Sequence, residues 1–122
     1  MKYVLMYTST PELDANADPE AAQELYRKVY EWFGTHAGVM ADSGAELLGV
    51  ETATTVKHGD DGAVVVDGPF NEAKEIIGGF SVIEVADLDA AVAVVKSWPL
   101  LDLPGVAVEI RPMVEDYSHM EG

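Results

Sequence analysis

The chain has 122 residues, enough for one compact domain with a sizeable core but too few for two. It carries 22 acidic and 7 basic residues, and this net charge of −15 disfavours direct binding to a nucleic-acid phosphate backbone. Cysteine is absent, which excludes disulfide frameworks, thiolate catalysis and thiolate metal sites. No apolar run approaches the roughly 20 residues that span a bilayer, and no cleavage signal opens the chain, so we expect a cytoplasmic protein.

The first expected strand runs from Lys2 to Thr8, where apolar side chains alternate onto both faces. After a polar linker, Asp18-Pro19-Glu20 predicts the start of a helix, because it combines an N-cap acceptor, a proline in the first turn and an acid near the positive end of the helix dipole. Apolar residues then recur at helical spacing, which predicts an amphipathic helix with His36 on its apolar stripe. The helix is expected to end between Thr35 and Ser43.

The second half of the chain predicts more strands and one helix. Asp87 is a candidate N-cap for that helix, and Pro99 limits its length. A turn is expected at Lys57-His58-Gly59-Asp60-Asp61-Gly62, between two strands of a hairpin, the second of which we expect to be buried. The expected strands are 45–55, 63–66, 76–85 and 106–111.

The order of elements is strand, helix, strand, strand, strand, helix, strand, which predicts a ferredoxin-like α+β fold within a single domain, 1–122. In this fold both helices cover one face of an antiparallel sheet and leave the other face bare. Because strands 2–8, 63–66 and 76–85 supply apolar residues for both faces, we expect a homodimer that packs sheet on sheet.

A longer pattern accompanies these elements. Asp67-Gly68-Pro69-Phe70 is followed by Gly78-Gly79-Phe80, and the last strand closes with Val108-Glu109-Ile110-Arg111-Pro112. In this order the chain resembles the YCII-related proteins, specifically the branch named for its Asp-Gly-Pro-Phe motif. The resemblance covers nearly the whole chain.

The resemblance implies a ferredoxin-like fold that dimerises as an α/β barrel. It also implies a proposed His and Asp active-site pair. Some members of the family resemble dehalogenating or muconolactone-handling enzymes, and others are associated with sigma factors. Asp67 matches the motif aspartate, but His36 has no residue-by-residue match to the histidine of the wider family.

The candidate catalytic residues are Asp67 and His36. Asp67 is interpreted either as a general acid or base at the edge of a cleft or as an acceptor of backbone N–H bonds that stabilises the Gly68-Pro69 turn. Lys74 is interpreted as an electrostatic partner for Asp67 or an anion-binding group, or else as a surface charge. Histidine side chains in general can exchange protons near neutral pH, so His36 is either the proton partner of Asp67 or a hydrogen-bonded core residue.

Two further residues are candidates for substrate binding: Phe70 within the motif, and Arg111, which can hold a carboxylate in bidentate fashion or form a salt bridge. No cofactor or metal is expected, because the histidines lack metal-ligand spacing and no nucleotide-binding glycine pattern is present. The leading hypothesis is a cofactor-free acid/base enzyme acting on a small organic molecule. The alternative is a non-catalytic ligand-binding or regulatory module that acts with a sigma factor.

Overall fold

The computed structural model describes residues 1–10, 18–68 and 76–116. Their elements follow the predicted order except that two strands stand where one was expected at 45–55, and three short 3-10 helices are added. The strands are β1 (Lys2–Ser9), β2 (Met40–Glu46), β3 (Thr54–Gly59), β4 (Gly62–Asp67), β5 (Ile76–Glu84) and β6 (Ala107–Pro112). The helices are α2 (Pro19–Thr35), α3 (Leu88–Val95) and the 3-10 turns η1 (Ala37–Val39), η2 (Val50–Thr52) and η3 (Pro99–Asp102).

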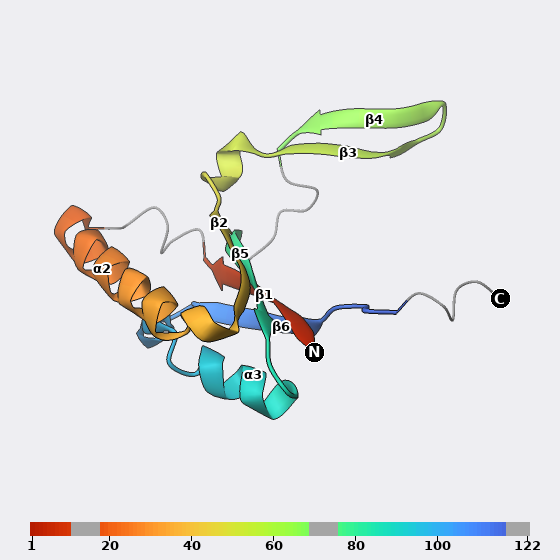
Figure 1. The fold of residues 1–122 in the computed structure, drawn as a ribbon. Coiled ribbons are helices and arrows are strands. Elements are labelled where there is room, and N and C mark those ends of the chain that lie inside the picture. The colour runs from red at the N-terminus through yellow and green to blue at the C-terminus, as the bar shows by residue number, and fades with distance from the viewer. Residues whose placement is uncertain (11–17, 69–75, 117–122) are drawn as a thin grey trace.

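Four strands form an antiparallel sheet in the order β2-β5-β1-β6. The register places Tyr3 opposite Ile83 and Leu5 opposite both Ser81 and Ile110. Because side chains alternate along a strand, these residues share one face of the sheet. Figure 1 shows α2 and α3 on the same side of this sheet, so the predicted ferredoxin-like α+β fold is confirmed.

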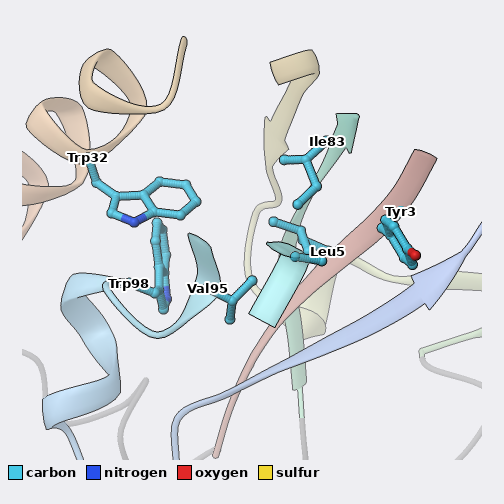
Figure 2. Packing of buried hydrophobic residues seen from close by; sticks show 7 residues of the cluster. Tyr3, Leu5, Trp32, Ile83, Val95 and Trp98 are labelled. Carbon is cyan, nitrogen blue, oxygen red and sulfur yellow. The ribbon is translucent and has the colours of Figure 1, made fainter. Parts of the chain in front are cut away.

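The core lies between that face and the two helices. Leu5 and Ile83 are fully buried, and Trp32 of α2 and Trp98 at the start of η3 close the end of the core (Figure 2). The two indoles meet edge to face, with ring centroids 5.0 Å apart. Burying large aromatic and aliphatic side chains in this way is the main favourable contribution to folding.

Local signals fix the helix ends. Asp87 caps α3 as predicted, since its carboxylate accepts a hydrogen bond from the backbone N–H of Ala90 at 2.9 Å. Asp18 stands at the N-cap of α2 with Pro19 following, but its side chain makes no cap hydrogen bond.

None of the helices in the described residues is long and apolar enough to cross a membrane.

Two strand predictions were wrong. The expected strand 45–55 is divided among the end of β2, the turn η2 and the start of β3. The apolar run 63–66 was expected to be buried, yet every residue of β4 is exposed, and β4 pairs only with β3 in a separate two-stranded sheet. Figure 1 shows this hairpin extending from one end of the main sheet, away from both helices.

Candidate functional site

His36 lies at the C-cap of α2, beside the buried end of the core. Its backbone N–H and its ring nitrogen Nδ1 both contact the carbonyl oxygen of Trp32, at 3.0 Å and 2.9 Å. A carbonyl oxygen can only accept, so Nδ1 carries the hydrogen and Nε2 holds the lone pair in the neutral ring. Within the described part of the chain, Nε2 has no hydrogen-bond partner.

Trp32 holds this arrangement in place. Its indole is 95% buried and donates from Nε1 to the hydroxyl of Ser97 at 2.9 Å, while that hydroxyl donates to the carbonyl of Val94. The imidazole of His36 lies 4.7 Å from the indole, centroid to centroid, with the rings tilted by 45°. The position of His36 is therefore set by a side chain that is itself fixed by packing and a hydrogen bond.

An open groove of about 470 Å³ runs along this end of α2. Trp32 and His36 contribute to it together with charged and polar side chains of α2 and the segment after α3. The lining residues are Lys28, Glu31, Trp32, Thr35, His36, Ser97 and Pro99. Most of these polar groups already have partners, since the Thr35 hydroxyl donates to the Glu31 carbonyl and the Ser97 hydroxyl is bonded as described above.

The groove contains two charged side chains, Glu31 and Lys28, and only Glu31 has a salt-bridge partner among the described residues. Arg27, on the exposed side of α2, bridges Glu24 and Glu31, which holds the pKa of the Glu24 carboxyl below its usual range and raises that of the guanidinium. Glu31 is thereby neutralised by a neighbour. Lys28 forms no salt bridge with any residue the structure describes, so the groove offers one ammonium group and one imidazole nitrogen.

A second hollow, of about 490 Å³, lies on the side of α2 that faces β2. It is lined by Phe33, Ala37, Met40, Ala41, Asp42 and Ser43. The carboxylate of Asp42 accepts from the backbone N–H of Gly44 at 2.8 Å and shapes the irregular first half of β2. The sequence did not identify these residues as candidates for a functional site, because Asp42-Ser43-Gly44 is typical of an ordinary turn.

A buried chain of hydrogen bonds supports this second hollow. Tyr7 donates to the hydroxyl of Ser81 at 2.9 Å, and Ser81 donates to the carbonyl of Ser43 at 2.7 Å. Ser81 is fully buried, and Tyr7 is stacked on Trp98 with centroids 4.4 Å apart. Burial raises the pKa of the Tyr7 phenol, and the bond to Ser81 offsets part of that increase.

Asp67 lies at the end of β4, on the exposed hairpin. The base of the hairpin is closed by other groups: Gly68 N–H donates to the carbonyl of Ala53, and the Thr55 hydroxyl donates to the carbonyl of Gly68, both at 2.7 Å. Gly68 adopts a φ of 106°, which favours glycine. The Asp67 carboxylate makes no hydrogen bond to any residue of the described ranges, 1–10, 18–68 and 76–116.

Arg111, the other predicted site residue within the described ranges, lies away from the groove at His36. Arg111 is exposed on β6 opposite Val4, on the sheet face away from the helices. Phe70 and Lys74 lie outside the described residues. No hydrogen bond or ion pair joins Asp67, His36 and Arg111 within the described chain, so their combined roles stay a prediction.

The described residues contain no group of three His, Asp or Glu side chains that could hold a metal ion. The chemistry that these residues offer is proton transfer and binding of a small anion or hydroxyl compound. His36 supplies an imidazole nitrogen, Nε2, and Lys28 supplies a positive charge 8 residues, or about two helical turns, earlier on α2.

Comparison with known proteins gives three findings. The family model of the YCII-related domain matches residues 1–114. An uncharacterised protein of Rhizobium meliloti (strain 1021) is 33% identical over 69 residues, which cover 57% of this chain and 56% of that protein. The chain thus matches little more than half the length of this curated relative.

A solved structure shares the fold. It is 5-chloro-2-hydroxyhydroquinone dehydrochlorinase from Burkholderia phenoliruptrix AC1100, in complex with 2,5-dihydroxybenzoquinone. The match has a TM-score of 0.57 and 14% identity, and it covers 95% of this chain and 96% of that one.

Proposed function

The chain belongs to the YCII-related family, and we propose that it transfers a proton to or from a small organic molecule in the groove beside the end of α2. The observation that carries the proposal is the hydrogen bond from Nδ1 of His36 to the carbonyl oxygen of Trp32. That bond selects one tautomer and leaves Nε2 as the basic atom. A histidine whose orientation and tautomer are fixed in this way suits general base catalysis near neutral pH.

The charges around the groove favour an acidic substrate. Lys28 contributes a positive charge that no described salt bridge neutralises, whereas Glu31 is engaged by Arg27. An enol, a phenol or a hydroxyquinone loses a proton to form an anion, and a nearby ammonium group stabilises that anion. We infer that the groove binds a flat, hydroxylated carbonyl compound and that Nε2 of His36 takes up its proton.

The structural neighbour suggests a probe of this class. That enzyme was solved with 2,5-dihydroxybenzoquinone, a small ring with acidic hydroxyl groups next to carbonyls. The similarity to this chain is one of fold, so the compound serves as a chemical probe for the proposed groove. Its ring hydrogens exchange for deuterium when a ring carbon of the anion takes up a deuteron from the deuterated Nε2 of His36 and then returns its hydrogen as a proton to the neutral Nε2, so loss of their signal reports proton transfer between the ring and the imidazole.

The experiment follows the ring proton signal of 2,5-dihydroxybenzoquinone in D₂O by NMR, with and without protein. We expect the wild-type chain to accelerate the loss of this signal. His36→Asn should abolish the acceleration, because the asparagine amide keeps an N–H donor near the position of Nδ1 but has no group in place of Nε2. His58→Asn, on the exposed hairpin, is the matched control and should behave as wild type.

Two outcomes would contradict the proposal. If the ring hydrogens exchange at the same rate with and without the wild-type protein, flat hydroxylated carbonyl compounds are excluded as substrates. Exchange that persists in His36→Asn but is lost in Asp67→Asn would make Asp67, at the end of β4, the proton carrier.

The other predictions from the sequence extend this proposal. We propose that the chain belongs to the Asp-Gly-Pro-Phe branch of the family and that it forms a homodimer through the bare sheet face, where Phe80 is 39% and Ile77 49% exposed. Arg111 shares that face and would bind an anion there. The sigma-factor association and the cytoplasmic location stay predictions.

A further inference from the structure

The groove beside the end of α2 is rich in hydrogen-bond acceptors and poor in donors. Apart from Lys28, four of its lining side chains carry a polar hydrogen when neutral, and each donates it to another group of the chain at 2.9 Å. Within the described chain, Lys28 is therefore the one lining side chain with polar hydrogens left to donate. The four bonds run from Trp32 to the Ser97 hydroxyl, from His36 to the Trp32 carbonyl, from Thr35 to the Glu31 carbonyl and from Ser97 to the Val94 carbonyl.

The backbone around the groove adds no further donor. The amides in the second half of α2 donate within the helix. The amides of Ser97 and Trp98 donate to carbonyls in the last turn of α3, and Pro99 has no N–H. A ligand oxygen that only accepts hydrogen bonds thus has the Lys28 ammonium as its partner, whereas a ligand hydroxyl that donates meets several acceptors.

Thr35 is the neutral acceptor with the most capacity. A hydroxyl oxygen has two lone pairs, and no described residue donates to that of Thr35. The Ser97 oxygen, by contrast, already accepts from Trp32. The Thr35 hydrogen is directed to the Glu31 carbonyl, so Thr35 can donate to a ligand only by giving up that bond. The group that fits beside Thr35 is therefore a donor.

We propose that Thr35 determines specificity in this groove: its hydroxyl oxygen accepts a hydrogen bond from a neutral hydroxyl of the ligand, while Lys28 holds the ligand's anionic oxygen. This inference rests on the proposed function. It narrows the substrate class to ring compounds with one ionised hydroxyl and a second hydroxyl that stays protonated. A methyl ether at the second position cannot donate and leaves Thr35 without a partner.

The spacing of the two residues fits a ring that carries these groups on opposite carbons. Lys28 precedes Thr35 by seven residues, almost two full turns, so both lie on one stripe of α2. Along the helix axis their Cα atoms are about 10 Å apart at 1.5 Å per residue. Two oxygens on opposite carbons of a benzene ring, each with a hydrogen bond of about 2.8 Å, bridge a separation of this order.

The test compares two probes that differ only in the second group, nitrohydroquinone and 4-methoxy-2-nitrophenol. In both, the hydroxyl beside the nitro group is the acidic one, and the opposite carbon carries either a hydroxyl or a methoxy group. Dissociation constants are measured by calorimetry at a pH at which the acidic hydroxyl is ionised and the other is protonated. We expect wild type to bind nitrohydroquinone about three- to tenfold more tightly, which is the contribution of one neutral hydrogen bond.

Variants assign this preference to a residue. Thr35→Val keeps the β-branched shape but removes the oxygen, so the two probes should bind with nearly equal constants. Thr35→Ser restores the hydroxyl and should restore the preference. Lys28→Gln should weaken both probes by a similar factor and leave their ratio unchanged. The matched control is Thr52→Val, which removes a similar bond from a threonine hydroxyl to a carbonyl, that of Gly49, outside the groove and should behave as wild type.

The ratio of the two constants is unaffected by a general loss of folded protein, so it tests the role of Thr35 directly. Equal binding of the two probes by wild type, or an unchanged preference in Thr35→Val, would overturn that role. Failure of wild type to bind either probe would overturn it as well. The deuterium exchange of 2,5-dihydroxybenzoquinone, measured with wild type and His36→Asn, decides separately whether proton transfer in the groove stands.

Discussion

Ser81 connects the central strand β5 to the segment of β2 that lines one of the two hollows, and its removal should be costly. The Ser81 hydroxyl accepts from Tyr7 at 2.9 Å and donates to the carbonyl of Ser43 at 2.7 Å, and the residue is fully buried. Ser81→Ala leaves two partly buried polar groups without their partner. An unsatisfied buried group costs about 1–3 kcal/mol, so we expect the free energy of unfolding to decrease by about that amount.

A double-mutant cycle with Tyr7→Phe separates this effect from packing. Phenylalanine keeps the ring that stacks on Trp98 and removes only the phenol oxygen. Tyr7→Phe alone should cost about 0.5–1.5 kcal/mol. In the double variant no Tyr7 hydroxyl is left unpaired, so the combined loss should be smaller than the sum of the single losses by at least about 0.5 kcal/mol.

The assay is urea unfolding monitored by tryptophan fluorescence, since Trp32 and Trp98 are both buried in the native chain. The four proteins are compared at one pH and temperature, with equal slopes in urea as the condition for comparing free energies. Additive single effects, or a loss below about 0.5 kcal/mol for Ser81→Ala, would refute the view that this hydrogen-bonded chain stabilises the fold.

Two other predictions concern pH and a backbone position. Because burial raises the pKa of Tyr7 in the folded state, the native chain holds this proton more tightly than the unfolded chain; the resulting stability is present below about pH 10 and is lost as the pH rises through the folded pKa. Thermal unfolding from pH 8 to 11.5 should therefore decline less steeply in Tyr7→Phe, and parallel curves would contradict this assignment. Gly44 has a φ of 73°, and a Cβ there would overlap the backbone of Phe80, so Gly44→Ala should destabilise the chain by more than about 1 kcal/mol. Gly38→Ala, where a Cβ meets nothing within 4 Å, is the control and should be close to neutral in the same denaturation experiment.

Local signals in the sequence were sufficient for most of the fold. The Asp18-Pro19 start of α2, the Asp87 cap of α3 and the apolar runs of β1, β5 and β6 are all encoded within a few neighbouring residues. Their order then restricts the topology to very few arrangements, since a sheet must bury one face against the helices. The family could be recognised for the same reason, because its pattern follows the order of the strands.

The candidate site was only partly visible in the sequence. His36 could be identified as a titratable residue near the end of a helix. The groove that it lines also depends on Ser97, which is 65 residues from its hydrogen-bond partner Trp32. Contacts between residues so far apart along the chain produce no periodic pattern in a single sequence. The hydrogen bonds that join Tyr7 to Ser81 and Ser81 to Ser43 could not be predicted from the sequence for the same reason.

The sequence by itself determined both helices, most of the strands and the α+β class, because helix caps, turns and hydrophobic periodicity act over short distances. Only the tertiary structure decided which apolar runs are buried. Val64, Val65 and Val66 have the composition of a core strand, yet they lie on an exposed hairpin. An apolar run shows that a segment tends to avoid water; whether its own fold or a second chain covers it depends on where the rest of the chain places that segment.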